Sequence, residues 1–73
     1  MIPTLADWDG AATAQGSVTA DTLNYRSLPN LQAPILGTWP RNTVLTIYCR
    51  VEKWLLVQAH ATGWSHSAYI QVA

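Results

Sequence analysis

The 73-residue sequence has one cysteine, no phenylalanine, few charged side chains and no long apolar run. Because Cys49 is the single cysteine, an internal disulfide is excluded, and a domain of this size must rely on packing and on association. No segment is long and apolar enough to span a membrane, and residues 1–4 lack the basic start and apolar run of a secretory signal. We therefore expect no membrane partner. Work outside a cell would require a larger carrier protein or release when the cell breaks open.

Charge is scarce and evenly balanced. Four basic and four acidic side chains give a formal net charge of +0. The basic residues are scattered along the chain, at Arg26, Arg41, Arg50 and Lys53. Nucleic-acid binding needs clustered Lys and Arg, so we expect no nucleic-acid partner. The hydrophobic content of 49% indicates a folded domain, and the near-zero charge makes self-association into a homo-oligomer easier.

The residue types that carry catalysis or bind metals are too few and too dispersed for an active site. The acidic residues form no converging pair, and they are Asp7, Asp9, Asp21 and Glu52. Cys49 with His60 or His66 is the one conceivable nucleophile or zinc set, but its spacing matches no compact zinc motif. Cys49 also alternates with Leu45 and Ile47, and a thiol on such a face usually packs as a small hydrophobe. We therefore expect a protein that is not an enzyme and uses no cofactor or metal.

Two regions of the chain differ in character. Residues 1–15 contain small residues without sustained alternation, which predicts an N-terminal tether or extension, and residues 16–73 form the folded domain. Short strands are predicted at 17–23, 35–39, 43–50, 54–59, 63–65 and 70–72, with one 3₁₀ turn at 67–69. A turn at 40–42 includes Asn42, a residue type that tolerates positive φ. Five or six short strands without room for a helix favour an all-β, partly open barrel.

Alternation in the central hairpin assigns one face to the core and leaves an apolar patch on the other. The core-facing positions are Leu45, Ile47, Leu55 and Val57. The outward patch consists of Val44, Tyr48, Trp54 and Leu56. Such a patch implies an interface with another copy, a neighbouring domain or a ligand. The alternative is that the N-terminal segment, with Ile2, Leu5 and Trp8, folds back over the patch.

Four short motifs occur in order along the chain. The first, Leu-Asn-x-Arg-Ser-x-Pro, is carried by Leu23, Asn24, Arg26, Ser27 and Pro29. The others are Ile35-Leu36-Gly37-Thr38, Trp54 with Val57, and Gly63-Trp64. Over residues 16–72 this series resembles the bacterial SH3 domain family, small barrels often attached to cell-wall hydrolases. The resemblance implies an SH3-like, partly open β-barrel in which Trp54 and Trp64 occupy framework positions.

The resemblance also implies a non-catalytic module that binds the peptide portion of bacterial peptidoglycan. Such a module targets a linked or associated peptidoglycan hydrolase, for example a phage endolysin or a bacterial autolysin. It acts at the bacterial cell wall, after phage lysis or as part of a larger exported protein. The residues expected to bind the ligand are Asn24, Tyr25, Arg26, Trp39 and Tyr69. The family usually has aliphatic residues at the positions of Tyr25 and Trp39, so we interpret these rings as stacking residues, and we expect Trp39→Ala to weaken binding without unfolding the domain.

Two other functions are weighed against wall binding. The outward patch would suit a protein-interaction module that forms oligomers or docks a neighbouring domain. Recognition of proline-rich peptides, as in eukaryotic SH3 domains, is disfavoured because those domains carry acidic residues in the first loop, and residues 27–35 contain none.

Overall fold

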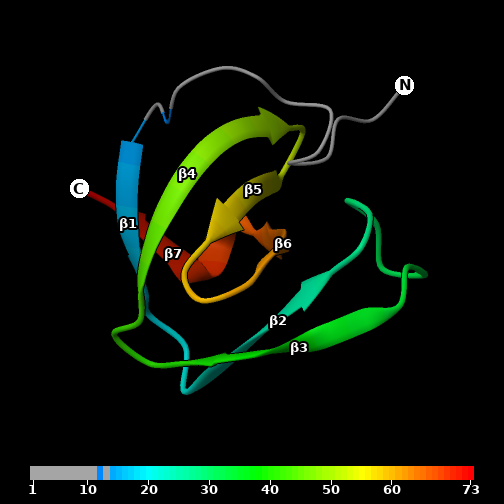
Figure 1. The fold of residues 1–73 in the computed structure, drawn as a ribbon, viewed down its shortest axis with the longest axis horizontal. Coiled ribbons are helices and arrows are strands. Elements are labelled where there is room, and N and C mark those ends of the chain that lie inside the picture. Colours follow the sequence, from blue (N-terminus) through cyan, green and yellow to red (C-terminus); the bar gives the residue numbers. More distant parts are fainter. Residues whose placement is uncertain (1–11, 13) are drawn as a thin grey trace.

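Within residue 12 and residues 14–73, which the computed structural model describes, seven short antiparallel strands and one 3₁₀ helix make up the fold. In chain order the elements are β1 (Ala14–Val18), β2 (Thr22–Arg26), β3 (Ile35–Pro40), β4 (Val44–Val51), β5 (Trp54–Gln58), β6 (Thr62–His66), η1 (Ser67–Tyr69) and β7 (Ile70–Val72). The strands form one sheet in the order β3-β2-β6-β5-β4-β1-β7, which curls on itself without closing (Figure 1). The predicted all-β, SH3-like, partly open barrel is confirmed. None of the described residues forms a helix long and apolar enough to cross a membrane.

The single strand predicted at 17–23 is two strands in the structure. β1 ends at Val18 and β2 starts at Thr22, because β1 pairs with β4 and β7 whereas β2 pairs with β3 and β6. β1 begins at Ala14, so it includes two residues of the predicted tether. Apart from residue 12, the rest of that segment lies outside the described residues. The residues expected to cover the outward patch lie there too, and they are Ile2, Leu5 and Trp8.

The main core fills the inside of the curled sheet. Its buried members are Val18, Leu23, Tyr25, Trp39, Leu45, Ile47, Leu55, Val57 and Ile70. The rings of Tyr25 and Trp39 stack on each other, with centroids 4.0 Å apart. Trp39 donates its Nε1–H to Oγ of Ser65 at 3.2 Å, and that hydroxyl donates to the carbonyl of Asn24 at 3.0 Å, so the buried indole N–H is satisfied. The predicted ligand stacking of Tyr25 and Trp39 is wrong, because the two residues are 8% and 0% exposed and form the core.

Two glycines make room for the Tyr25 ring on the neighbouring strands. A β-carbon at Gly63 would lie 2.8 Å from Cδ2 of Tyr25 and 3.2 Å from the carbonyl oxygen of Arg26. A β-carbon at Gly37, which pairs with Tyr25 across β2 and β3, would collide with the hydroxyl end of the same ring. A large aromatic residue on β2 therefore depends on glycine in both β3 and β6.

We expect Gly63→Ala to lower the free energy of unfolding by about 1–3 kcal/mol, because Tyr25 and the backbone of Arg26 would have to move. Urea denaturation followed by far-UV circular dichroism measures the loss. Gly37→Ala is the matched comparison and is expected to destabilise less, because its methyl group meets only the far end of the ring. A Gly63→Ala domain as stable as the parent would contradict the packing described around Tyr25.

A β-bulge in β4 changes the face that its later residues occupy. Ile47 pairs with Val57, but Cys49 pairs with Leu56, so the register shifts at Tyr48. Cys49 therefore lies on the face opposite the core. The prediction that Cys49 shares a face with Ile47 is wrong, because strict alternation assumes a strand without a bulge.

A second buried pair lies on the outer face of β5 and β6. Leu56 pairs with Trp64 across the two strands, and each residue is 1% exposed. Neither belongs to the main core, which takes its β5 side chains from Leu55 and Val57. Leu56 therefore faces away from the main core, as the alternation predicts, but it is buried and does not offer an accessible interface. Trp64 is buried, as its framework position implies.

Candidate binding groove

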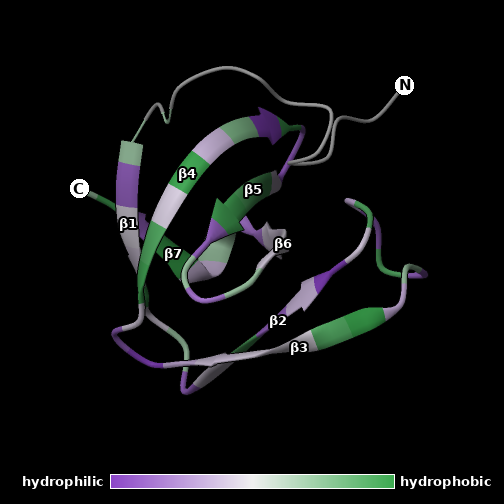
Figure 2. Ribbon diagram, in the orientation of Figure 1, coloured by the Kyte–Doolittle hydropathy of each residue, from purple (hydrophilic) through white to green (hydrophobic). Residues whose placement is uncertain are grey.

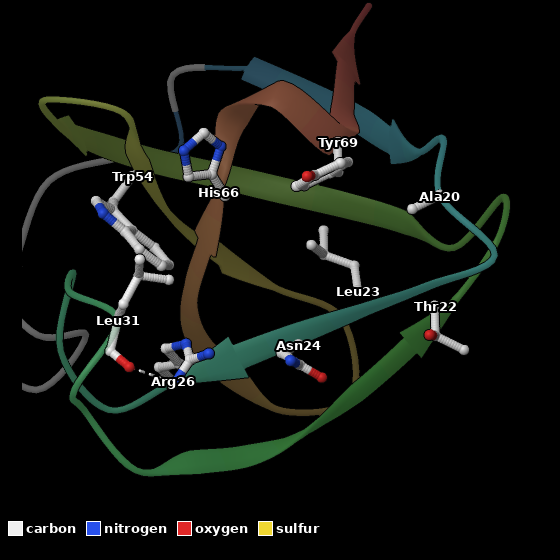
Figure 3. A pocket seen from close by; sticks show the side chains of 9 residues that line it. All are labelled: Ala20, Thr22, Leu23, Asn24, Arg26, Leu31, Trp54, His66 and Tyr69. Carbon is white, nitrogen blue, oxygen red and sulfur yellow. Dashed lines mark hydrogen bonds between the residues drawn. The ribbon is translucent and has the colours of Figure 1, made fainter.

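An open groove of about 370 Å³ lies along the outer side of β2, between the β2–β3 loop and η1. The residues that line it come from five separate segments, and they are Ala20, Thr22, Leu23, Asn24, Arg26, Leu31, Trp54, His66 and Tyr69. Figure 3 shows Trp54, His66 and Tyr69 along one side of the groove, facing β2 on the other. The volume is in the range of pockets that hold small ligands or short peptide segments.

Three rings form a row that we call the aromatic wall, namely Trp54, His66 and Tyr69. Trp54 and His66 are cross-strand partners on β5 and β6, and their ring centroids are 5.4 Å apart with planes at 70°. The His66 and Tyr69 centroids are 5.8 Å apart. Trp54 and His66 are half-buried, and Tyr69 is 50% exposed. Partly exposed rings of this kind offer flat apolar area with little loss of rotamer entropy on binding.

The short helix η1 connects two members of the aromatic wall and is capped by one of them. His66 is the N-cap residue, and its Nδ1 accepts the backbone N–H of Ala68 at 3.1 Å. A neutral histidine that accepts at Nδ1 carries its proton on Nε2. The cap thus holds the imidazole in the wall and leaves Nε2–H as a donor without a hydrogen-bond partner among the described residues.

The opposite side of the groove is polar and comes from β2. Thr22, Asn24 and Arg26 alternate along the strand with residues that point into the core, Leu23 among them. Arg26 also braces the β2–β3 loop, because its Nη1 donates to the carbonyl of Leu31 at 3.1 Å and to that of Ala33 at 3.0 Å. This brace positions Leu31, which is 70% exposed, at one end of the groove (Figure 3).

Comparison with known proteins identifies the fold family. The bacterial SH3 domain matches residues 21–71, which is well over half of the chain. The chain belongs to the bacterial SH3 domain family. Members of this family are generally non-catalytic modules that bind cell walls or protein partners. No curated protein and no solved structure matches the chain significantly.

The groove of this bacterial SH3 domain brings together three of the five residues expected to bind the ligand. Asn24, Arg26 and Tyr69 line it, whereas Tyr25 and Trp39 belong to the core. Four lining residues with informative side chains were not among those expected to bind the ligand, and they are Thr22, Leu31, Trp54 and His66, of which Trp54 was assigned to the outward patch. A signal for two of these was present, because Trp54 and His66 fall on the same face as Leu56 and Trp64 when the strands alternate regularly. No sequence signal placed Leu31 there, since its position depends on the brace to Arg26.

The outward patch predicted on the central hairpin is not one continuous surface. Val44, the first residue of β4, is 64% exposed. Tyr48 is half-buried and donates its hydroxyl to Oε1 of Gln58 at 2.6 Å. Trp54 lines the groove and Leu56 is buried. The four residues therefore do not form the single apolar interface that simple alternation predicts.

The candidate nucleophile and zinc residues of this bacterial SH3 domain do not assemble into a site. Within residue 12 and residues 14–73, no group of three His, Cys, Asp or Glu side chains is close enough to hold a metal ion. His60 packs edge-on against the buried Trp39, with ring centroids 5.5 Å apart, and His66 belongs to the groove. Burial raises the pKa of the Cys49 thiol, which lowers its thiolate fraction and its reactivity.

We expect Cys49 to react with iodoacetamide more slowly than free glutathione does at mildly alkaline pH. The thiol stays protonated to a higher pH in the folded domain than in the unfolded chain. Ionisation of this thiol therefore does not change the free energy of unfolding at neutral pH. It lowers that free energy as the pH rises above about 8.5, the usual thiol pKa, because the unfolded chain loses the proton first. Mass spectrometry of the alkylation time course measures the rate. A rate above that of glutathione would show an activated thiol and contradict this account.

Proposed function

We propose that this bacterial SH3 domain is a non-catalytic module that binds the peptide portion of bacterial peptidoglycan. In this proposal it concentrates a linked or associated lytic enzyme at the cell wall and breaks no bond itself. The domain reaches the wall as part of a larger exported protein or after lysis of the cell. The observation that carries the proposal is the row of partly exposed rings facing hydrogen-bonding side chains across one groove.

The groove suits an extended peptide better than a globular surface. The aromatic wall offers flat faces against which peptide groups and small side chains can pack. On the other side, Asn24 is exposed and no hydrogen bond of its side chain is recorded within the described residues, so its amide is available to a peptide backbone. One short groove gives weak affinity, but the wall repeats the same peptide many times. A tethered or multimeric domain therefore rebinds at high effective concentration.

Co-sedimentation with purified sacculi tests the proposal. The domain is mixed with sacculi from Gram-positive and Gram-negative bacteria, and its fraction in the pellet is measured against sacculus concentration. We expect saturable pelleting with at least one wall type and none with cellulose particles. A domain that stays in the supernatant with every wall type would refute the proposal.

A protein-interaction role is the second candidate, and one observation favours it. β3 is an edge strand whose first residues, Ile35 and Leu36, are 52% and 55% exposed. Figure 2 shows this end of β3 as a hydrophobic segment. An exposed apolar edge strand is a ready site for pairing with another strand. Sedimentation velocity separates the two candidates, because an assembly module gives a concentration-dependent oligomer that Leu36→Lys abolishes.

A further inference from the structure

We infer that the ligand of the groove presents a free carboxylate to Arg26, so that the domain distinguishes a peptide acid from the same peptide in its amidated form. The inference rests on the proposed function, because it specifies the chemistry of the peptide that the groove would take. It is carried by the balance of charges and of hydrogen-bond donors around the groove.

Arg26 is a positive charge without a carboxylate partner among the described residues. The ion pair among the described residues joins Arg41 to Asp21, just after β3 and just before β2, at the end of this hairpin opposite its loop. No Asp or Glu lines the groove. A half-buried guanidinium that is not neutralised by the protein favours an anionic ligand.

One nitrogen of the Arg26 guanidinium binds the β2–β3 loop, and the other two have no partner among the described residues. Nη1 gives both of its recorded hydrogen bonds to the loop carbonyls of Leu31 and Ala33. No interaction of Nη2 or Nε with another described residue is recorded. The brace fixes the guanidinium plane and so reduces the entropy lost on binding, and the free edge matches the two oxygens of a carboxylate.

The other polar side chains that line the groove can all donate hydrogen bonds. Nε2–H of His66 has no recorded partner because Nδ1 takes the Ala68 N–H. The indole N–H of Trp54 and the hydroxyl of Tyr69 also line the groove without a recorded hydrogen bond inside the described chain. Donors that line the same groove as an unpaired cation favour a ligand rich in acceptors. A peptide segment with carbonyl oxygens and a terminal or side-chain carboxylate has this composition.

The test compares native sacculi with sacculi whose carboxylates have been converted to carboxamides by carbodiimide and ammonia. We expect conversion to weaken pelleting of the parent domain by about tenfold, the usual effect of losing one charge-assisted hydrogen-bonded pair. Equal pelleting with both preparations would overturn the inference while leaving the proposed function in place. No pelleting with native sacculi would overturn the proposed function and the inference with it.

Asn24→Asp tests the same inference without disturbing the loop brace. Asn24 lies two residues before Arg26 on the same face of β2, so the Cα atoms of the two residues are roughly 7 Å apart along the strand. A carboxylate at position 24 would therefore lie close enough to the Arg26 side chain to compete with an anionic ligand. We expect this variant to bind native sacculi about fivefold more weakly than Asn24→Ala does, and to bind amidated sacculi about as well as Asn24→Ala does.

Two matched controls accompany Asn24→Asp. Asn24→Ala removes the amide without adding charge, and Gln71→Glu adds the same charge on exposed β7, away from the groove. Both are expected to retain the preference of the parent for native sacculi. If Asn24→Asp behaves like Gln71→Glu on native sacculi, the groove does not hold an anion and the inference fails.

Discussion

Trp39→Ala is expected to leave most of the domain unfolded, in contrast to the binding defect that the sequence alone predicts. Removing a fully buried indole costs about 3–5 kcal/mol, and a domain of this size has a total stability of only about 5 kcal/mol. The loss also leaves the stacked face of Tyr25 against a cavity. Urea denaturation followed by circular dichroism measures the change.

Trp39→Phe is the control that divides this loss into two parts. The phenyl ring keeps much of the packing against Tyr25 but removes the N–H that Ser65 accepts. The hydroxyl of Ser65 still donates to the carbonyl of Asn24, so we expect an intermediate loss of about 1–3 kcal/mol. A stable Trp39→Ala domain with weakened wall binding would return Trp39 to the ligand site and contradict the core described here.

Tyr69→Ala is expected to have the opposite phenotype. The ring is 50% exposed and no hydrogen bond of its hydroxyl is recorded within the described residues, so stability should change by less than about 0.5 kcal/mol. Wall affinity should fall by at least about fivefold, because an exposed aromatic residue that anchors a ligand commonly contributes more than about 1 kcal/mol. The sacculus pelleting assay measures the affinity.

Val72→Ala is the matched control for Tyr69→Ala. Val72 is 53% exposed on β7 and does not line the groove that contains Tyr69. Its replacement should alter neither stability nor pelleting. Equal pelleting by the parent and by Tyr69→Ala would remove the aromatic wall from the binding site.

Local patterns in the sequence predict much of the strand framework. The alternation that includes Leu45 and Ile47 places both side chains in the core, as the structure confirms. The turn after β3 contains Asn42 with φ of 69°, in the region where asparagine is tolerated. The 3₁₀ turn predicted at 67–69 is η1, because three residues leave no length for anything longer.

The errors come from features that depend on distant parts of the chain. The bulge at Tyr48 is set by how β4 pairs with β5, and it moves Cys49 to the other face. Trp39 packs in the core against Tyr25, and its buried indole N–H is satisfied by Ser65 on β6, a partner that no local pattern indicates. Polar aromatic residues suit both cores and binding surfaces, so residue type alone does not separate Trp39 from Trp54.

The groove could be predicted only in part for the same reason. The resemblance to the family points to Asn24, Arg26 and Tyr69, and all three line the groove. His66 joins them because its imidazole caps η1 while pairing across the sheet with Trp54. That double role requires the register of β5 against β6, which alternation within one strand does not give.

A nitrogen-15 NMR titration with soluble muropeptides tests the central claim most directly, because each tryptophan has its own indole resonance. We predict that the indole N–H of Trp54 and the backbone signals of Asn24, His66 and Tyr69 shift in a saturable way, with the buried Trp39 unchanged and the muropeptides uncleaved. Shifts confined to Ile35 and Leu36 on the edge of β3, or no shifts at all, would contradict a wall-binding groove.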